Sequence, residues 1–130
     1  MGKNVIWHTV AYMRQLLMRK SDHIDIEILK LPSWKSPYND WIDGIKDSVT
    51  RARIRRRLDR LEQGHYGDYK PLGDGVHELK FHFGSGYRIY FAELDDVIVI
   101  LLCGGDKSTQ KNDVKIAKQY WRELQEKLNE

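Results

Sequence analysis

The stretch VHELKFHF-GSG-YRIYFAEL, residues 76–94, decides the fold of this chain. Alternating apolar and polar residues run on both sides of the loop Gly84-Ser85-Gly86. Period-two alternation around a short glycine loop is typical of an antiparallel β-hairpin. Asp95-Asp96 then turns the chain into the apolar run VIVILLC at 97–103, which predicts a strand buried on both faces and central in the sheet.

The hairpin sorts its side chains onto two faces. Pairing Phe83 with Tyr87 across the loop gives one apolar and one polar face, because successive side chains of a strand alternate. The apolar face, expected against the core, carries Leu79, Phe81, Phe83, Tyr87, Ile89 and Phe91. The polar face, expected in contact with solvent, carries Glu78, Lys80, His82, Arg88 and Tyr90. A slip of one residue would place charge in the core.

The residues before the hairpin predict one strand and two helices. Isoleucine at every second position predicts a half-buried strand over 23–31. Ser36-Pro37 is typical of a helix N-cap followed by proline, and the apolar stripe of that helix reaches Val49. A second helix is predicted over 50–63, and Gly64 is a suitable residue to end it.

The remaining segments complete a small α+β domain. Glycine and proline predict a loop over 64–75, and apolar residues at helical spacing predict a final helix over 112–128. The order is then β-α-α-β-β-β-α, which we interpret as a mainly antiparallel four-stranded sheet with helices on one side. Residues 1–20 are expected to be an extension, either helical or disordered, and the domain itself covers 21–130.

Length and composition indicate a single domain. The chain has 130 residues, a net charge of +3 and 41% hydrophobic residues, which suits one domain with its own core. A single cysteine, Cys103, excludes an internal disulfide and a multi-cysteine zinc site, and we expect it buried in a strand. No apolar run reaches the length of a membrane span and no signal peptide is visible, so we expect a cytoplasmic protein.

Basic residues are concentrated in the segment 50–70, whose surplus of +4 exceeds that of the whole chain. The arginines of this segment have almost no acidic partners four residues away. Their mutual repulsion costs stability, which favours a surface that binds a polyanion. Docking of an acidic protein segment is the alternative. The arginines are Arg51, Arg53, Arg55, Arg56, Arg57 and Arg60.

The polar face of the hairpin has the groups that phosphate chemistry needs. Lys80 and Arg88 carry fixed positive charge, His82 can transfer a proton, and Tyr90 can stack on a base. Lys107 follows the apolar strand and is expected near its end. An ordinary solvated sheet face is the other interpretation, and residue types alone favour it.

The remaining histidines show no metal-ligand spacing and are expected to be structural or surface residues: His8, His23, His65 and His77.

Three segments match a known family: LGDGVHELK at 72–80, GYRIYF at 86–91 and LLCGGDKSTQ at 101–110. They resemble the RelE/ParE toxin superfamily, and more narrowly its HigB-like addiction module killer branch. Trp41-Ile42, Ala52-Arg53-Ile54 and the segment 58–64 fit this resemblance as well. It therefore extends from about Ile24 to Trp121, and the fold of the family has the element order predicted above.

The resemblance implies a toxin of a type II toxin–antitoxin pair, neutralised by an antitoxin that in this branch is usually a helix-turn-helix protein. RelE-like members cut mRNA on the ribosome without a metal or other cofactor, by attack of a ribose 2′-hydroxyl on the adjacent phosphate. The family's basic positions fall on Lys107, Lys80 and Arg88, and we add His82 as base or acid. The expected contacts to mRNA and rRNA are Tyr87, Tyr90, Lys70 and the six arginines of 50–70.

Two family positions differ here, and two other functions stay open. Phe83 stands where RelE-like toxins have a catalytic arginine, and the final helix has no clear match to their C-terminal Tyr or His. ParE-like members inhibit DNA gyrase without cleaving nucleic acid, and such a protein would act through its helical hairpin. A degenerate homologue would only bind its antitoxin.

Overall fold

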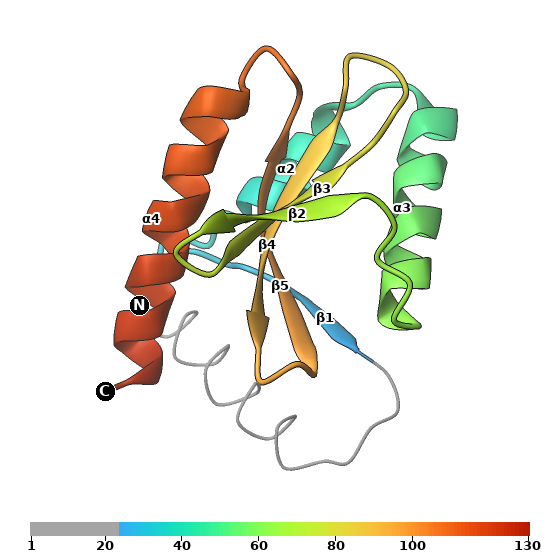
Figure 1. The fold of residues 1–130 in the computed structure, drawn as a ribbon. Helices are drawn as coiled ribbons and strands as arrows, with labels where there is room; N and C mark the ends of the chain where they lie inside the picture. The colour runs from blue at the N-terminus through green and yellow to red at the C-terminus, as the bar shows by residue number, and fades with distance from the viewer. Residues whose placement is uncertain (1–23) are drawn as a thin grey trace.

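The structure of the chain, a computed structural model, describes residues 24–130, and Figure 1 shows its arrangement. The elements in chain order are β1 (Asp25–Ile28), α2 (Pro37–Gly44), α3 (Ser48–Glu62), β2 (Tyr69–Gly73), β3 (Val76–Lys80), β4 (Arg88–Leu94), β5 (Ile98–Gly105) and α4 (Gln110–Leu128). The predicted α+β class is confirmed. The expected extension at residues 1–20, with His8 and His23, lies outside the described residues.

The sheet has five strands in the order β1-β5-β4-β3-β2. Among the strands of residues 24–130, β1 and β5 alone pair in parallel, and the other neighbours are antiparallel. The fifth strand is β2, in the segment for which the sequence predicts only a loop. It is an exposed edge strand with a register shift between Pro71 and Gly73, so neither its composition nor its burial gives a strand pattern.

Helices cover both faces of the sheet, which corrects the expectation of helices on one side. Within residues 24–130, α2 and α3 pack on one face and α4 packs on the other (Figure 1). The first core joins Ile42, Ile54 and Leu61 to the apolar face of the hairpin. The second joins Trp121 and Leu124 to the opposite face. Strand β5 contributes to both cores and is almost completely buried, as predicted.

The hairpin pairs two residues away from the predicted register. Lys80 lies opposite Arg88, and the Phe81 N–H donates to the Tyr87 carbonyl over 3.0 Å. The loop therefore holds the five residues 82–86 instead of three. Because a shift of two preserves the alternation, each side chain keeps its predicted face. The interpretation of the polar face as solvated is wrong for Glu78, Arg88 and Tyr90, which are buried. It holds near the loop, where Lys80 is half-buried and His82 is exposed.

The helical hairpin breaks earlier than predicted. Helix α2 ends at Gly44, and Asp47 caps the next helix by accepting from the Val49 N–H over 3.2 Å. Val49 consequently belongs to α3, where 64% of its surface is exposed, and it does not extend the apolar stripe of α2. Gly64 follows α3 with a φ of 88°, a conformation that suits glycine. Among the described residues, no helix combines the length and apolar character needed to cross a membrane.

Candidate functional site

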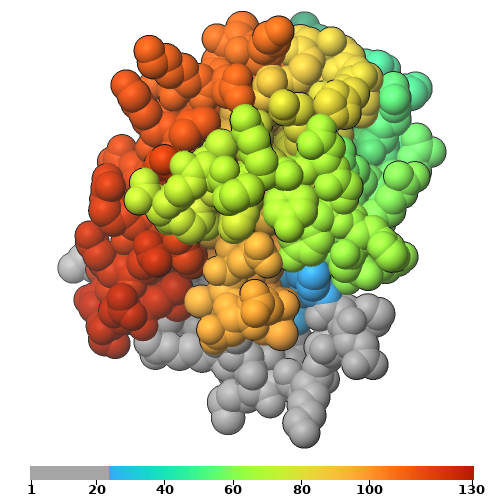
Figure 2. Space-filling view, viewed as in Figure 1, coloured from blue at the N-terminus to red at the C-terminus, as the bar shows by residue number. Residues whose placement is uncertain are grey.

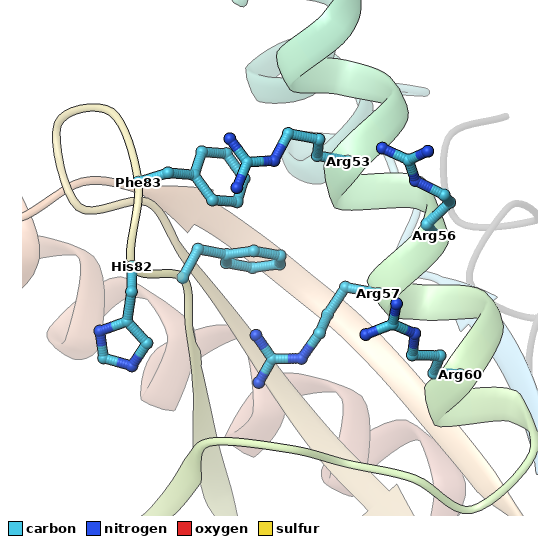
Figure 3. Close-up of a pocket in the computed structure, with 7 residues that line it drawn as sticks. Arg53, Arg56, Arg57, Arg60, His82 and Phe83 are labelled. Carbon is cyan, nitrogen blue, oxygen red and sulfur yellow. The ribbon is translucent and has the colours of Figure 1, made fainter.

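A basic groove lies between α3 and the β3–β4 loop. It has a volume of about 340 Å³ and is lined by four arginines of α3. Figure 3 shows that Arg53 and Arg57 extend from the helix toward the loop, whereas Arg56 and Arg60 lie close to the helix. We call this site the arginine groove, defined by Arg53, Arg56, Arg57, Arg60, Phe81, His82 and Phe83. The arginines recur at intervals of three and four, which places them on one side of a helix.

Arg57 joins α3 to the segment that follows it. Its Nη1 donates to the Lys80 carbonyl over 2.7 Å, and its Nη2 donates to the carbonyls of Tyr66 (3.1 Å) and Asp68 (2.9 Å). Its guanidinium also lies over the Phe81 ring, 5.0 Å from the ring centroid. Burial lowers the pKa of Arg57 from its ordinary value. Arg57 therefore forms the inner wall of the groove, and the more exposed arginines provide its accessible charge.

An aromatic pair faces those charges from the loop. The guanidinium of Arg53 lies 3.8 Å from the centroid of the Phe83 ring, within the range of a cation–π contact. Phe83 in turn meets Phe81 edge to face, with ring centroids 5.8 Å apart. Exposed Arg56 and Arg60 complete the α3 side. Positive charge beside aromatic rings is the combination that binds phosphate groups and stacks on bases.

His82 stands at the loop side of this groove and contacts a carboxylate. Its Nε2 is in hydrogen-bond contact with Oδ2 of Asp68, and this bond is the largest influence that lowers the pKa of Asp68. The Asp68 carboxylate is therefore ionised at neutral pH and can only accept, so Nε2 of His82 is the donor. A neutral His82 then keeps the lone pair on Nδ1. The pair has the arrangement of an oriented general base.

Comparison with known proteins identifies the family. Residues 40–122 match the family model described as Phage derived protein Gp49-like (DUF891). The chain belongs to the Gp49-like family. This family is RelE/HigB-like and associated with toxin–antitoxin systems. The chain is also 45% identical over 87 residues to an uncharacterized protein of Haemophilus influenzae. This alignment covers 67% of the present chain and 88% of the Haemophilus protein. No solved structure matches the present chain.

The Gp49-like segment includes the whole arginine groove and Asp68. It also includes the pair of glycines at the end of β5. A Cβ on Gly104 would lie 2.2 Å from the Trp41 ring, and one on Gly105 would lie 1.8 Å from Oδ2 of Asp113. These glycines let α2 and α4 approach the end of β5 from opposite faces. In this chain, the residues that follow lie beside the hairpin loop, where the Lys107 N–H donates to the Ser85 carbonyl.

The structure places the four predicted catalytic residues in different surroundings. His82 lines the groove, and Lys80 is half-buried next to it, where its charge contributes to lowering the pKa of Asp68. Lys107 is exposed, and its N–H donates to the Ser85 carbonyl over 3.3 Å. Arg88 is only 7% exposed and does not line the groove.

The structure also places the predicted substrate contacts in different surroundings. Tyr90 is completely buried under α4, and Tyr87 packs edge to face on Trp41 and Phe83. Lys70 is exposed on β2, opposite Glu78. The arginines outside the groove are Arg51, whose Nη1 donates to the Ile45 and Lys46 carbonyls, and exposed Arg55.

Sequence reasoning missed three residues of this site. Asp68 lies in the segment predicted to be a loop, fourteen residues from His82, and no spacing rule connects the two. Phe81 and Phe83 were expected only in the core. Phe83 is half-buried at the edge of that core, so one ring serves both the packing and the groove. The two unassigned histidines of the described residues keep structural or surface positions, His77 on the core face and His65 exposed.

Proposed function

We propose that this Gp49-like protein is the toxin of a toxin–antitoxin pair and that it cleaves RNA as a HigB-like endoribonuclease. One observation carries the proposal: His82, in contact with Asp68, lines the same groove as four arginines. A titratable imidazole supplies proton transfer, and guanidinium groups stabilise the negative charge that accumulates on phosphorus. The family association supports an antitoxin as the partner.

We propose the following steps for this site. Nδ1 of His82 takes the proton of a ribose 2′-hydroxyl, whose oxygen then bonds to the adjacent phosphorus. The bond from phosphorus to the 5′-oxygen breaks, and that oxygen takes a proton from solvent water as it leaves, while His82 releases the proton it accepted to solvent. The products are a 2′,3′-cyclic phosphate and a 5′-hydroxyl. Arg56 and Arg60 hold the phosphate, and Lys80 adds positive charge beside the base.

We further propose that the substrate is ribosome-bound mRNA in the cytoplasm. Exposed Arg56 and Arg60 would then contact mRNA, and Lys70 would contact rRNA from a neighbouring surface. Lys107, exposed beside the hairpin loop, is a further phosphate contact. The antitoxin is expected to be a helix-turn-helix protein.

Primer extension on a translated mRNA, with purified protein, tests the cleavage. We expect wild type and His65→Ala to cut at the same positions, because His65 is an exposed histidine outside the groove. His82→Ala should reduce the cleavage rate by about a hundredfold or more, and Asp68→Asn should reduce it less. Absence of cleavage by wild type, or equal cleavage by His82→Ala, would contradict the proposal.

Two observations favour two other functions. Arg88, a position that the resemblance assigns to catalysis, is buried under α4, and Phe83 stands at another catalytic arginine position. A non-cleaving inhibitor of DNA gyrase or a homologue that only binds its antitoxin fits these two facts. A supercoiling assay distinguishes the first, since inhibited gyrase with intact mRNA would establish it. Induced expression without growth arrest would establish the second.

A further inference from the structure

Tyr69 presents an aromatic ring at the surface of the edge strand β2. It is 42% exposed, yet its ring packs against three others on its inner side. The ring centroids of Tyr66, His77 and Phe91 lie 4.9, 6.1 and 6.3 Å away. Tyr69 is therefore supported from below and accessible from outside. Figure 2 shows the yellow-green β2 segment at the surface between α4 and α3.

The rings beneath Tyr69 are fixed by polar contacts. The Tyr66 hydroxyl donates to Oε2 of Glu93 over 3.0 Å, and Nε2 of His77 lies 3.5 Å from Oε1 of the same carboxylate. His77 also stacks on Phe91, with centroids 5.2 Å apart and planes at 19°. Since these partners hold their positions, Tyr69 loses little conformational freedom when something stacks on it.

Tyr69 adjoins the arginine groove. It pairs with Leu79, two residues before Phe81 in the groove, and residues two apart on a strand are roughly 7 Å apart. Arg57 links the two places directly, because its guanidinium lies over Phe81 and donates to the carbonyls of Tyr66 and Asp68. Figure 3 shows Arg57 pointing away from Arg53, along the groove. A chain bound by the arginines can therefore reach Tyr69 within a nucleotide or two.

We infer that Tyr69 is a nucleobase-stacking site for single-stranded RNA held by the arginine groove. The inference rests on the proposed function and extends it to a second part of the surface. Stacking on an exposed ring tolerates any base, because every base has a π-face. The nearby carboxylate of Glu93 already has Tyr66 and His77 as partners, so we expect this site to give affinity and positioning with little base discrimination.

Fluorescence anisotropy with the full chain tests the inference. The probe is a labelled six-nucleotide RNA whose riboses are 2′-O-methylated, which prevents cleavage. We expect Tyr69→Ala to raise Kd about tenfold, and Tyr69→Phe to bind like wild type because the ring remains. The control is Trp34→Ala, which removes a 66% exposed aromatic residue between β1 and α2. This variant should bind like wild type.

A second arm does not depend on how well Tyr69→Ala folds. Probes with one abasic position each are titrated into wild type, and one position should weaken binding about as much as Tyr69→Ala does. The Tyr69→Ala variant should bind that abasic probe as tightly as it binds the intact probe. If no abasic position matters while Arg56→Ala and Arg60→Ala weaken binding, the stacking site is refuted and the groove stands. If wild type has no affinity for the probe, both the groove and the stacking site are refuted.

Discussion

Arg88 is held by Glu78 beneath α4, with Nε of Arg88 3.5 Å from Oε2 of Glu78 and both side chains buried. Gln110, the first residue of α4, donates to the same Glu78 oxygen over 2.8 Å. Nη1 of Arg88 donates to the Gly86 carbonyl over 2.8 Å. The pair thus connects α4 to the hairpin loop that carries His82. The guanidinium that we expected to stabilise charge on the substrate therefore contacts Glu78 and the Gly86 carbonyl in this structure.

Breaking this pair from one side should destabilise the fold strongly. Arg88→Ala leaves Glu78 buried without its counter-charge, and removing one partner in this way costs about 3–5 kcal/mol. We expect the free energy of unfolding in urea to fall by about that amount. The double substitution Glu78→Leu with Arg88→Met should cost less than either Arg88→Ala or Glu78→Ala. Additive effects in the double variant would show that the two side chains do not act as a pair.

Arg57 should be a stability residue among the arginines of the groove. Arg57→Ala removes the donor of the hydrogen bonds to Tyr66, Asp68 and Lys80, and half-buried acceptors left without partners cost about 1–3 kcal/mol. Chemical denaturation should show this decrease. The matched control is Arg56→Ala, one residue earlier and exposed, which should stay within about 0.5 kcal/mol of wild type. Equal decreases in both variants would refute the distinction.

Gly104 should tolerate no side chain while Trp41 is present. A Cβ at this position would lie 2.2 Å from Cε3 of Trp41, and overpacking of this kind costs about 1–3 kcal/mol. Gly104→Ala should therefore lower Tm. In a Trp41→Leu background, Gly104→Ala should lower Tm by less than it does in the wild-type background. If the two substitutions were strictly additive, the close approach of α2 to β5 would not explain the glycine.

Cys103 should react slowly and contribute to a decline of stability at high pH. Burial raises the pKa of Cys103 to about 12, so the native state keeps its proton where an unfolded thiol has already released it. Because the native state binds more protons over that range, the free energy of unfolding falls as pH rises above the ordinary thiol pKa. Cys103→Ala should show a shallower fall. Iodoacetamide at about pH 8, near the ordinary thiol pKa, should label Cys103 only after unfolding, and rapid labelling of native protein would contradict its burial.

The hairpin, the buried strand β5 and the helices could be predicted because each has a strong local pattern. Alternation around the Gly84-Ser85-Gly86 loop fixes the two faces, and a register error of two leaves them unchanged. Edge strand β2 escaped prediction, since Pro71 and the neighbouring glycines give no alternation and the strand exists only by pairing with β3.

The candidate site was harder to predict because charge patterns do not identify partners. Six arginines on one helix are visible in the sequence, but only the structure separates Arg57, bonded to three carbonyls, from exposed Arg56 and Arg60. In the same way, Arg88 resembles a surface cation until Glu78 and α4 are in place. The pairing of His82 with Asp68 depends on β2 lying beside β3, which no local pattern predicts.

Binding of RNA phosphates in the arginine groove is tested most directly by the salt dependence of RNA affinity. The measurement is Kd for the 2′-O-methylated RNA against salt concentration, for wild type, Arg56→Ala, Arg60→Ala and the control Arg55→Ala. Removing one arginine that binds a phosphate should weaken binding and reduce the slope of log K against log salt by about 0.7. We predict this change for Arg56→Ala and Arg60→Ala but not for Arg55→Ala, an exposed arginine outside the groove. Equal weakening in all three variants, or a wild-type affinity that does not depend on salt, would contradict phosphate binding in this groove.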